Sequence, residues 1–190
     1  MQKNRWFLTA LIVVVLAATA GFATFHFVKA KIARSFSVPD FRRQVSPKTG
    51  TKSDYDFQYS TLDGKVRRIS QLRGKVVFVN FWGTWCIRCV VEMPNIQKLY
   101  DKLKHDKSVV FLIPSRLDTP ERVRWYARYN HYDLPFYTVR DQDIPPAMHF
   151  NQYPTTFIYD KDGLVVEKQI GGANWDDPKA IQYIKTLESQ

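Results

Sequence analysis

The stretch from Val76 to Cys89 reads VVFVNFWGTWCIRC, and it decides the fold. Its first five residues are almost all β-branched or aromatic, which is typical of a central strand that is covered on both faces. After the turn at Gly83 and Thr84, apolar residues recur three, four or seven positions apart, which predicts a helix up to about Lys104. These residues are Val90, Met93, Ile96, Leu99, Tyr100 and Leu103. The sequence therefore predicts a buried strand that leads into two cysteines at the start of a helix.

Cys86 and Cys89 form a C-x-x-C pair at this predicted helix start. Unpaired backbone N–H groups and the helix dipole favour an anion there, so we expect a low pKa for the Cys86 thiol and a nucleophilic thiolate. Cys89 lies one turn further into the helix, where its thiol can attack a mixed disulfide on Cys86 and release the product. The pair predicts a redox-active disulfide, and two unreactive core cysteines are the alternative.

The same spacing also occurs in zinc and haem sites, and the rest of the chain argues against both. The sequence holds only two cysteines, and its four histidines form no H-x(3–5)-H pair, so a zinc site would lack ligands. Covalent haem attachment needs a histidine directly after the second cysteine, where Val90 stands. We therefore expect no metal site and no cofactor.

Short apolar runs and turn residues predict the other elements. Asp63 and Gly64 lie between two extended runs, which indicates a β-hairpin ahead of the central strand. Further strands are expected at 109–113, 136–139, 155–159 and 164–170, helices at 119–130 and 178–187, and a short helix or loop at 141–152. The crossovers predict parallel strands with helices on both faces and an antiparallel hairpin at one edge, which is an α/β fold.

Three motifs in this order resemble the thioredoxin superfamily, and within it the membrane-anchored, extracytoplasmic TlpA/ResA type. They are FWGTWCIRC at 81–89, Glu92-Met93-Pro94, and Tyr153-Pro154-Thr155-Thr156-Phe157. The resemblance covers about residues 54 to 187 and implies a thioredoxin fold, a central mixed sheet flanked by helices with an N-terminal β-hairpin extension. It implies a thiol–disulfide oxidoreductase that acts on disulfide-containing proteins and is re-reduced by a membrane-bound thiol donor. The family leans toward reducing its partners, which include apocytochrome c.

The resemblance also gives roles to Glu92 and Pro154. Asn80 stands where thioredoxin has a buried Asp, and an amide cannot take a proton, so Glu92 is the nearest candidate to accept the proton of Cys89. TlpA/ResA-type chains have a similar Glu at this spacing, although Glu92 could also simply complement the helix dipole. Pro154 matches the family's cis-proline, which presents backbone to an extended substrate; a proline that merely opens a strand is the alternative.

Trp85, Arg88 and Tyr153 are the remaining candidates for contact with a substrate protein. We expect Trp85 in an exposed apolar collar where a partner docks, and Trp82 packed inside. Arg88 either stabilises the Cys86 thiolate slightly, through a charge that solvent screens, or shapes the surface that meets partners. Tyr153 is assigned to the substrate site together with the proline that follows it.

Residues 6–28 contain no Asp, Glu, Lys or Arg and predict a single membrane-spanning helix. A helix needs about 20 residues to cross a hydrocarbon core of about 30 Å. A cleaved signal peptide is the alternative, because Ala18-Thr19-Ala20 fits a cleavage site. We favour the anchor because the apolar run continues to Val28. The resemblance places the C-terminal domain in the periplasm or otherwise outside the cytoplasm, although the Lys and Arg counts on the two sides of the span do not fix its orientation.

The charge distribution divides the chain further. Residues 1–45 carry seven of the 28 Lys and Arg but only one of the 18 Asp and Glu. We therefore expect an anchor or signal sequence at 1–28, a basic tether with little core of its own at 29–53, and the thioredoxin-like domain at 54–190. Beyond residue 45 both signs are interspersed and no nucleic-acid motif occurs, so we expect no nucleic-acid partner.

Two other functions stay open from the sequence. A thioredoxin-fold binding or holdase module would keep the dithiol without cycling it. An oxidase would run in the opposite direction and donate its disulfide to secreted proteins. The reduction potential separates the oxidase from the reductase, and sequence does not fix a potential.

Overall fold

A mixed β-sheet carries the fold in the computed structural model, which describes Thr19, Thr24, residues 38–42 and residues 55–189. Within these residues the sheet has seven strands in the order β2-β1-β5-β4-β3-β6-β7. The strands are β1 (Gln58–Thr61), β2 (Val66–Arg68), β3 (Val76–Phe81), β4 (Val109–Arg116), β5 (Phe136–Val139), β6 (Thr155–Tyr159) and β7 (Val165–Ile170). The helices are α2 (Ile87–Leu103), α3 (Pro120–Tyr129) and α4 (Pro178–Glu188), with short 3-10 helices η2 (Ile69–Leu72), η3 (Asp141–Asp143) and η4 (Pro146–Met148).

Strand β3 lies near the centre of the sheet, as its composition predicts. It pairs in parallel with β4 and antiparallel with β6, and all six of its residues are buried. Val76 and Phe78 belong to the core on one face, and Val77 and Val79 belong to the core on the other. Successive side chains of a strand point to opposite faces, so a strand buried on both sides needs a continuous apolar run.

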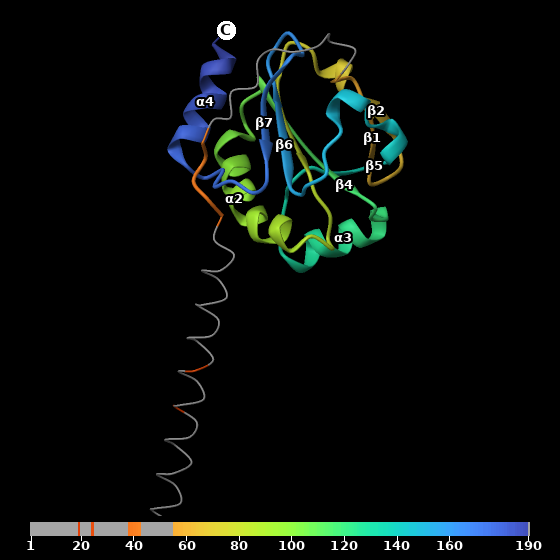
Figure 1. Cartoon of the computed structure of the whole chain (residues 1–190), viewed down its shortest axis with the longest axis vertical. Coiled ribbons are helices and arrows are strands. Elements are labelled where there is room, and N and C mark those ends of the chain that lie inside the picture. Colours follow the sequence, from red (N-terminus) through yellow and green to blue (C-terminus); the bar gives the residue numbers. More distant parts are fainter. Residues whose placement is uncertain (1–18, 20–23, 25–37, 43–54, 190) are drawn as a thin grey trace, which may run out of the picture. The chain divides into compact units, whose positions relative to one another are not determined.

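Two hairpins complete the sheet at its edges (Figure 1). The predicted hairpin of β1 and β2 joins the sheet through antiparallel pairing of β1 with β5. Strand β7 pairs antiparallel with β6 and forms the opposite edge. The result is the expected thioredoxin-like α/β arrangement with an N-terminal hairpin extension.

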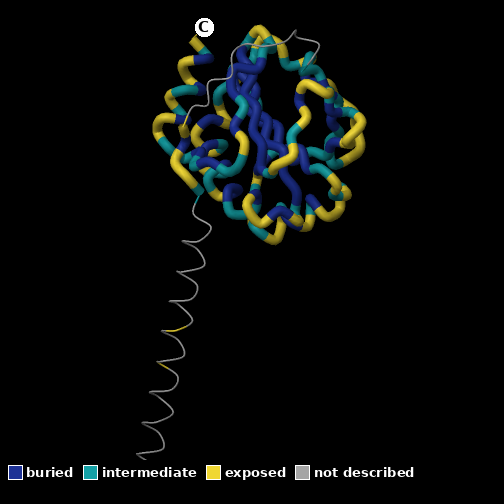
Figure 2. The backbone as a smooth tube through the Cα atoms, in the orientation of Figure 1, coloured by how far each residue is buried: buried dark blue, intermediate teal, exposed yellow. Residues whose placement is uncertain are grey.

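Helices α2, α3 and α4 share one face of the sheet, which differs from the expectation of helices on both faces. Buried residues of α2, α3 and α4 all pack in one cluster, together with Phe78 and Phe111. The other face is covered by Ile69 of η2, by Ile144 after η3, by Met148 of η4, and by Phe57 and Tyr59. Both crossovers, β3 to β4 and β4 to β5, step in the same direction, and right-handed crossovers then place both helices on one side. Figure 2 shows the buried strands at the centre of the domain.

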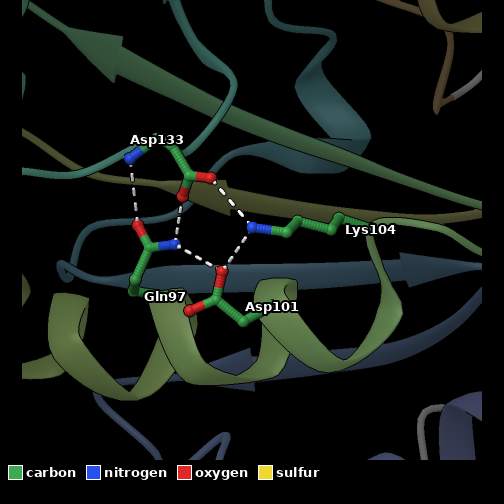
Figure 3. Close-up of polar contacts among 4 residues, drawn as sticks. All are labelled: Gln97, Asp101, Lys104 and Asp133. Carbon is green, nitrogen blue, oxygen red and sulfur yellow. Dashed lines mark hydrogen bonds and ion pairs between the residues drawn. The ribbon is translucent and has the colours of Figure 1, made fainter.

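Helix α2 is held at its far end by a cluster of polar side chains (Figure 3). The Gln97 side chain donates to Asp101, at 3.1 Å, and to Asp133, whose backbone N–H it accepts at 3.2 Å. The Lys104 ammonium contacts Asp101 at 2.8 Å and Asp133 at 3.0 Å. Because Asp133 belongs to the connection between α3 and β5, these contacts fix the orientation of the helix whose first turn carries the cysteines.

Residues 38–42 pack against the domain. Phe41 is buried, with its ring centroid 5.2 Å from that of Trp175 and 6.1 Å from that of Tyr183. The Asn174 backbone N–H donates to the Pro39 carbonyl at 2.7 Å. The sequence predicts a tether from residue 29 to residue 53, whereas the compact unit begins at Val38.

The predicted membrane span lies outside the described residues, apart from Thr19 and Thr24. In the part of the chain that the structure describes, no helix is both long and apolar enough to cross a membrane. The anchor at 6–28 therefore stays a prediction.

Candidate active site

Cys86 and Cys89 form a disulfide at the N-terminus of α2, as the sequence predicts. Cys86 is the N-cap residue, and its Sγ accepts a hydrogen bond from the Cys89 backbone N–H at 3.2 Å. The helix start therefore presents an N–H group to this sulfur, the arrangement that stabilises a thiolate. Cys86 is 8% exposed and Cys89 is fully buried. A partner sulfur can thus reach only Cys86 from the surface.

The turn before Cys86 is fixed by Asp118, a residue that the sequence analysis missed. The carboxylate of Asp118 accepts the Thr84 backbone N–H and the Thr84 hydroxyl, each at 2.8 Å. It also accepts the Ser115 hydroxyl at 2.6 Å, and only 1% of its side chain is exposed. A Cβ at position 83 would lie 2.4 Å from the Trp85 indole nitrogen, so a larger residue than Gly83 would displace that ring. The turn therefore holds the first cysteine in a defined place.

The two tryptophans of the motif divide as expected. Trp82 is fully buried, and its indole N–H donates to the Ile113 carbonyl at 3.1 Å. Trp85 is 46% exposed, and its indole N–H donates to the Arg116 carbonyl at 3.2 Å. Trp85 also contacts Tyr153 edge to face, with ring centroids 4.9 Å apart. These two rings form an aromatic surface directly beside Cys86.

Glu92 is a fully buried carboxylate on the second turn of α2. Its Oε1 accepts the Ala173 backbone N–H at 2.8 Å and the Trp175 indole N–H at 2.7 Å, and its Oε2 accepts the Asn80 amide at 3.1 Å. Burial raises the pKa of Glu92 from 4.5 to about 7, although all three hydrogen bonds act to lower it. A carboxyl group with this pKa can both accept and return a proton near neutral pH.

Asn80 positions this carboxylate from the neighbouring strand. Its amide nitrogen donates to Glu92 and, at 2.8 Å, to the Thr156 hydroxyl. Its amide oxygen is buried without a hydrogen bond from any described residue. Because β3 and β6 pair Asn80 with Thr156, the sheet itself brings these groups together under the dithiol helix.

The peptide bond between Tyr153 and Pro154 is cis, as the resemblance implies. Pro154 is buried, and its carbonyl accepts the Gly171 backbone N–H at 2.8 Å. The Tyr153 hydroxyl accepts a hydrogen bond from the Arg116 guanidinium at 2.7 Å. Arg88 lies on the exposed side of α2, where solvent screens its charge.

Sequence reasoning missed Asp118, Arg116 and Trp175, which all support the site from elsewhere in the chain. Arg116 ends β4 and Asp118 follows it, while Trp175 belongs to the segment between β7 and α4. Strands β3 and β4 are parallel neighbours, so their carboxyl ends lie at the same end of the sheet. Binding sites of α/β proteins form at this end. That end could have directed attention to the first two residues. Among the described residues, no group of three or more His, Cys, Asp or Glu side chains could hold a metal ion.

Comparison with known proteins agrees with this geometry. Residues 51–168 match the AhpC/TSA family. The thiol-disulfide oxidoreductase ResA from Bacillus cereus is 34% identical over 173 residues, which cover 90% of this chain and 91% of that protein. ResA from Geobacillus thermodenitrificans is 28% identical over 191 aligned positions, with 98% of each chain covered.

Solved structures share the fold. The crystal structure of StoA from Bacillus subtilis has a TM-score of 0.56 at 20% identity, and the match covers 74% of this chain and 98% of that one. The family match spans more than half of the chain, and the ResA relative covers nearly all of it. The chain therefore belongs to the thioredoxin-like AhpC/TSA family, within which it is a ResA-like thiol–disulfide oxidoreductase.

Proposed function

We propose that this protein reduces disulfides of partner proteins outside the cytoplasm, from a position on the membrane that residues 6–28 provide. The observation that carries the proposal is the unequal exposure of the two sulfurs above a buried carboxylate. Cys86 is reachable, Cys89 is enclosed, and Glu92 is three residues further along the same helix. This arrangement supports one attacking thiol, one resolving thiol and one proton acceptor.

The reaction begins with the reduced dithiol. The Cys86 thiolate attacks one sulfur of the partner disulfide, the partner S–S bond breaks, and one partner thiolate leaves. Glu92 accepts the proton of Cys89, and the resulting thiolate attacks the Cys86 sulfur of the mixed disulfide. The second partner thiolate leaves and takes up a proton, and two electrons have passed to the partner. The enzyme ends with the Cys86–Cys89 disulfide, which is the form in the structure.

A thiol donor must then reverse these steps on the enzyme. A membrane-bound donor suits an anchored protein, since anchoring both partners raises their effective concentration. The resemblance to TlpA/ResA-type proteins supports apocytochrome c, with its cysteine pair, as one class of partner.

Insulin reduction tests the role of the nucleophile. With dithiothreitol as the electron source, we expect the wild-type protein to reduce insulin and Cys86→Ser to lose the activity. Retained activity in Cys86→Ser would refute the proposal. Cys89→Ser should instead accumulate mixed disulfides with its partners, and the captured proteins identify the physiological substrate class. A glutathione redox titration separates the alternatives, because a dithiol that does not cycle favours a binding module and a strongly oxidising potential favours an oxidase.

A further inference from the structure

A hollow of about 500 Å³ is lined in part by Arg116 and Phe150, which both contact Tyr153. Its walls come from the end of β4, from the connection between β5 and β6, and from the end of the edge strand β7. The residues that matter for its chemistry are Arg116, Asp141, His149, Phe150, Lys168 and Ile170. Its volume falls within the range of about 300–1,000 Å³ that is typical of ligand sites.

Arg116 joins this hollow to the active site. Its backbone N–H donates to the Trp82 carbonyl at 2.9 Å, and its carbonyl accepts the Trp85 indole N–H. Its guanidinium donates to the Tyr153 hydroxyl and lies 5.8 Å from the centroid of the Phe150 ring. Arg116 therefore lines the hollow and at the same time contacts the residues around the dithiol.

A row of three aromatic rings leads from the dithiol to the hollow. Trp85 follows the turn and directly precedes Cys86, and its ring contacts Tyr153 at 4.9 Å between centroids. Tyr153 in turn contacts Phe150, a residue of the hollow, at 5.1 Å. A partner segment whose sulfur meets Cys86 and whose chain crosses these rings arrives at the hollow.

The hollow carries an excess of positive charge. Arg116 pairs with Asp141, so these two charges offset each other. Lys168 contacts the His149 carbonyl at 3.3 Å and lies 5.4 Å above the Phe157 ring, and no carboxylate of a described residue pairs with it. Ile170, which is 42% exposed, adds an apolar rim.

We propose that this hollow binds an acidic side chain on the partner segment that flanks the target disulfide, with Lys168 as the pairing cation. The proposal rests on the proposed function, and it adds a selection for acidic flanks to the reduction of protein disulfides. The carboxylate pairs with the ammonium group, while the alkyl part of the acidic side chain packs on Ile170 and Phe150. Tyr153 and Arg116 set the distance between this contact and the reacting sulfurs.

Charge-swapped peptides test the proposal. Each peptide carries one disulfide and either Glu or Lys at a single position, and the position is moved one residue at a time along both sides of the disulfide. Reduced full-length protein is mixed with increasing peptide, and the half-saturating concentration is measured in single turnovers. At one position we expect the Glu peptide to half-saturate at a concentration about fivefold lower than the Lys peptide, with the difference shrinking in high salt.

Three variants assign this preference. Lys168→Glu should favour the Lys peptide, and Lys168→Gln should lose the preference without inverting it. Lys179→Glu changes the net charge by the same amount on exposed α4, and it should keep the wild-type preference. Circular dichroism and the reduction potential of each variant check that fold and dithiol are intact.

The two levels of the proposal fail differently. Equal half-saturation by Glu and Lys peptides at every position, or a preference that Lys168→Glu and Lys179→Glu alter alike, would overturn the acidic subsite. Wild-type protein that reduces none of the peptides at any concentration would overturn the proposed reductase function itself.

Discussion

Glu92 is a carboxylate that the fold holds away from water and from other charges. Burial raises its pKa to about 7, and the hydrogen bonds from Ala173, Trp175 and Asn80 act to lower that pKa. The donors favour the charged form, but the loss of hydration outweighs them. The group is therefore about half protonated near neutral pH, the condition in which a proton acceptor works best.

Glu92→Gln should change how the stability of the oxidised protein depends on pH. The folded pKa of about 7 lies above the unfolded value of 4.5, so the folded protein keeps a proton that the unfolded chain has already released. Stability therefore falls as pH rises from about 4.5 to about 7 and stays constant above that range. This difference is worth about 3 kcal/mol. Urea unfolding at pH 5 and pH 8 should show most of that loss in the wild type and none of it in Glu92→Gln. The Asn80 amide can flip to accept the new N–H group, so the variant should fold.

Glu121→Gln is the matched control for this measurement. It removes a carboxylate from the exposed surface of α3, and the variant should keep the wild-type difference between pH 5 and pH 8. Equal pH dependence in wild type and Glu92→Gln would show that the buried carboxyl does not titrate in this range.

The same substitution should slow the second step of catalysis. Without a carboxylate, the Cys89 thiol loses its proton acceptor, and the loss of a general base lowers a rate by about 10²–10⁴-fold. Acid quenching during insulin reduction should therefore trap more mixed disulfide on Cys86 in Glu92→Gln than in the wild type. A residue that only complements the helix dipole would leave the amount of trapped intermediate unchanged.

The cysteines and the proline could be assigned from the sequence because their motifs are local. The C-x-x-C pair is recognised by its spacing, and Pro154 is recognised by the residues that follow it. Asp118 and Trp175 could not be assigned in this way. Asp118 contacts Thr84, and Trp175 contacts Glu92, across long separations in the sequence. Such contacts depend on the folded arrangement of β4 and of the segment after β7, and no sequence periodicity indicates them.

The segment Val38–Arg42 is an element that the sequence concealed. Phe41 is one of two aromatic residues, with Phe36, in the basic and polar stretch 29–53, and nothing in that composition marks Phe41 as buried. It packs on Trp175, whose indole donates to Glu92. By contrast, β3 and α2 each have a continuous pattern, and the structure confirms both. The sequence also did not indicate the face of the sheet on which each helix packs, because that face depends on the order of the strands in the sheet.

Phe41→Ala should detach this segment while the domain stays folded. The lost ring leaves a gap against Trp175 and Tyr183, and large-to-small changes of this kind cost about 3–5 kcal/mol in a core. Hydrogen exchange of the Asn174 amide, which donates to the Pro39 carbonyl, should become faster by at least tenfold. Arg42→Ala is the control, because that side chain is exposed and its removal should leave the exchange rate unchanged. Unchanged exchange in Phe41→Ala would mean that this ring does not hold the segment.

At the scale of the whole chain, the described domain is distinct from the N-terminal apolar run of residues 6–28. The domain supplies the chemistry, and we propose that residues 6–28 keep it at a membrane. The sequence predicts both the thioredoxin fold and this run. It does not decide between anchor and cleaved signal, because both begin with a similar apolar stretch.

Fractionation of cells that express the full chain should settle its attachment. We expect the protein in the membrane pellet after a carbonate wash, because a helix of this length inserts almost irreversibly. A variant that starts at Val38 should leave the pellet and still reduce insulin. The intact mass of the purified protein is the second readout, since a mature chain that begins after Ala20 would contradict the anchor.

The half-exposed indole of Trp85 gives the molecule an optical signal of its own. Fluorescence from an indole is quenched by a neighbouring disulfide, and Trp85 directly precedes Cys86 in the chain. Emission should therefore brighten when the bond opens and dim when it closes. Electron flow through the enzyme can then be followed in real time, without a dye or a label.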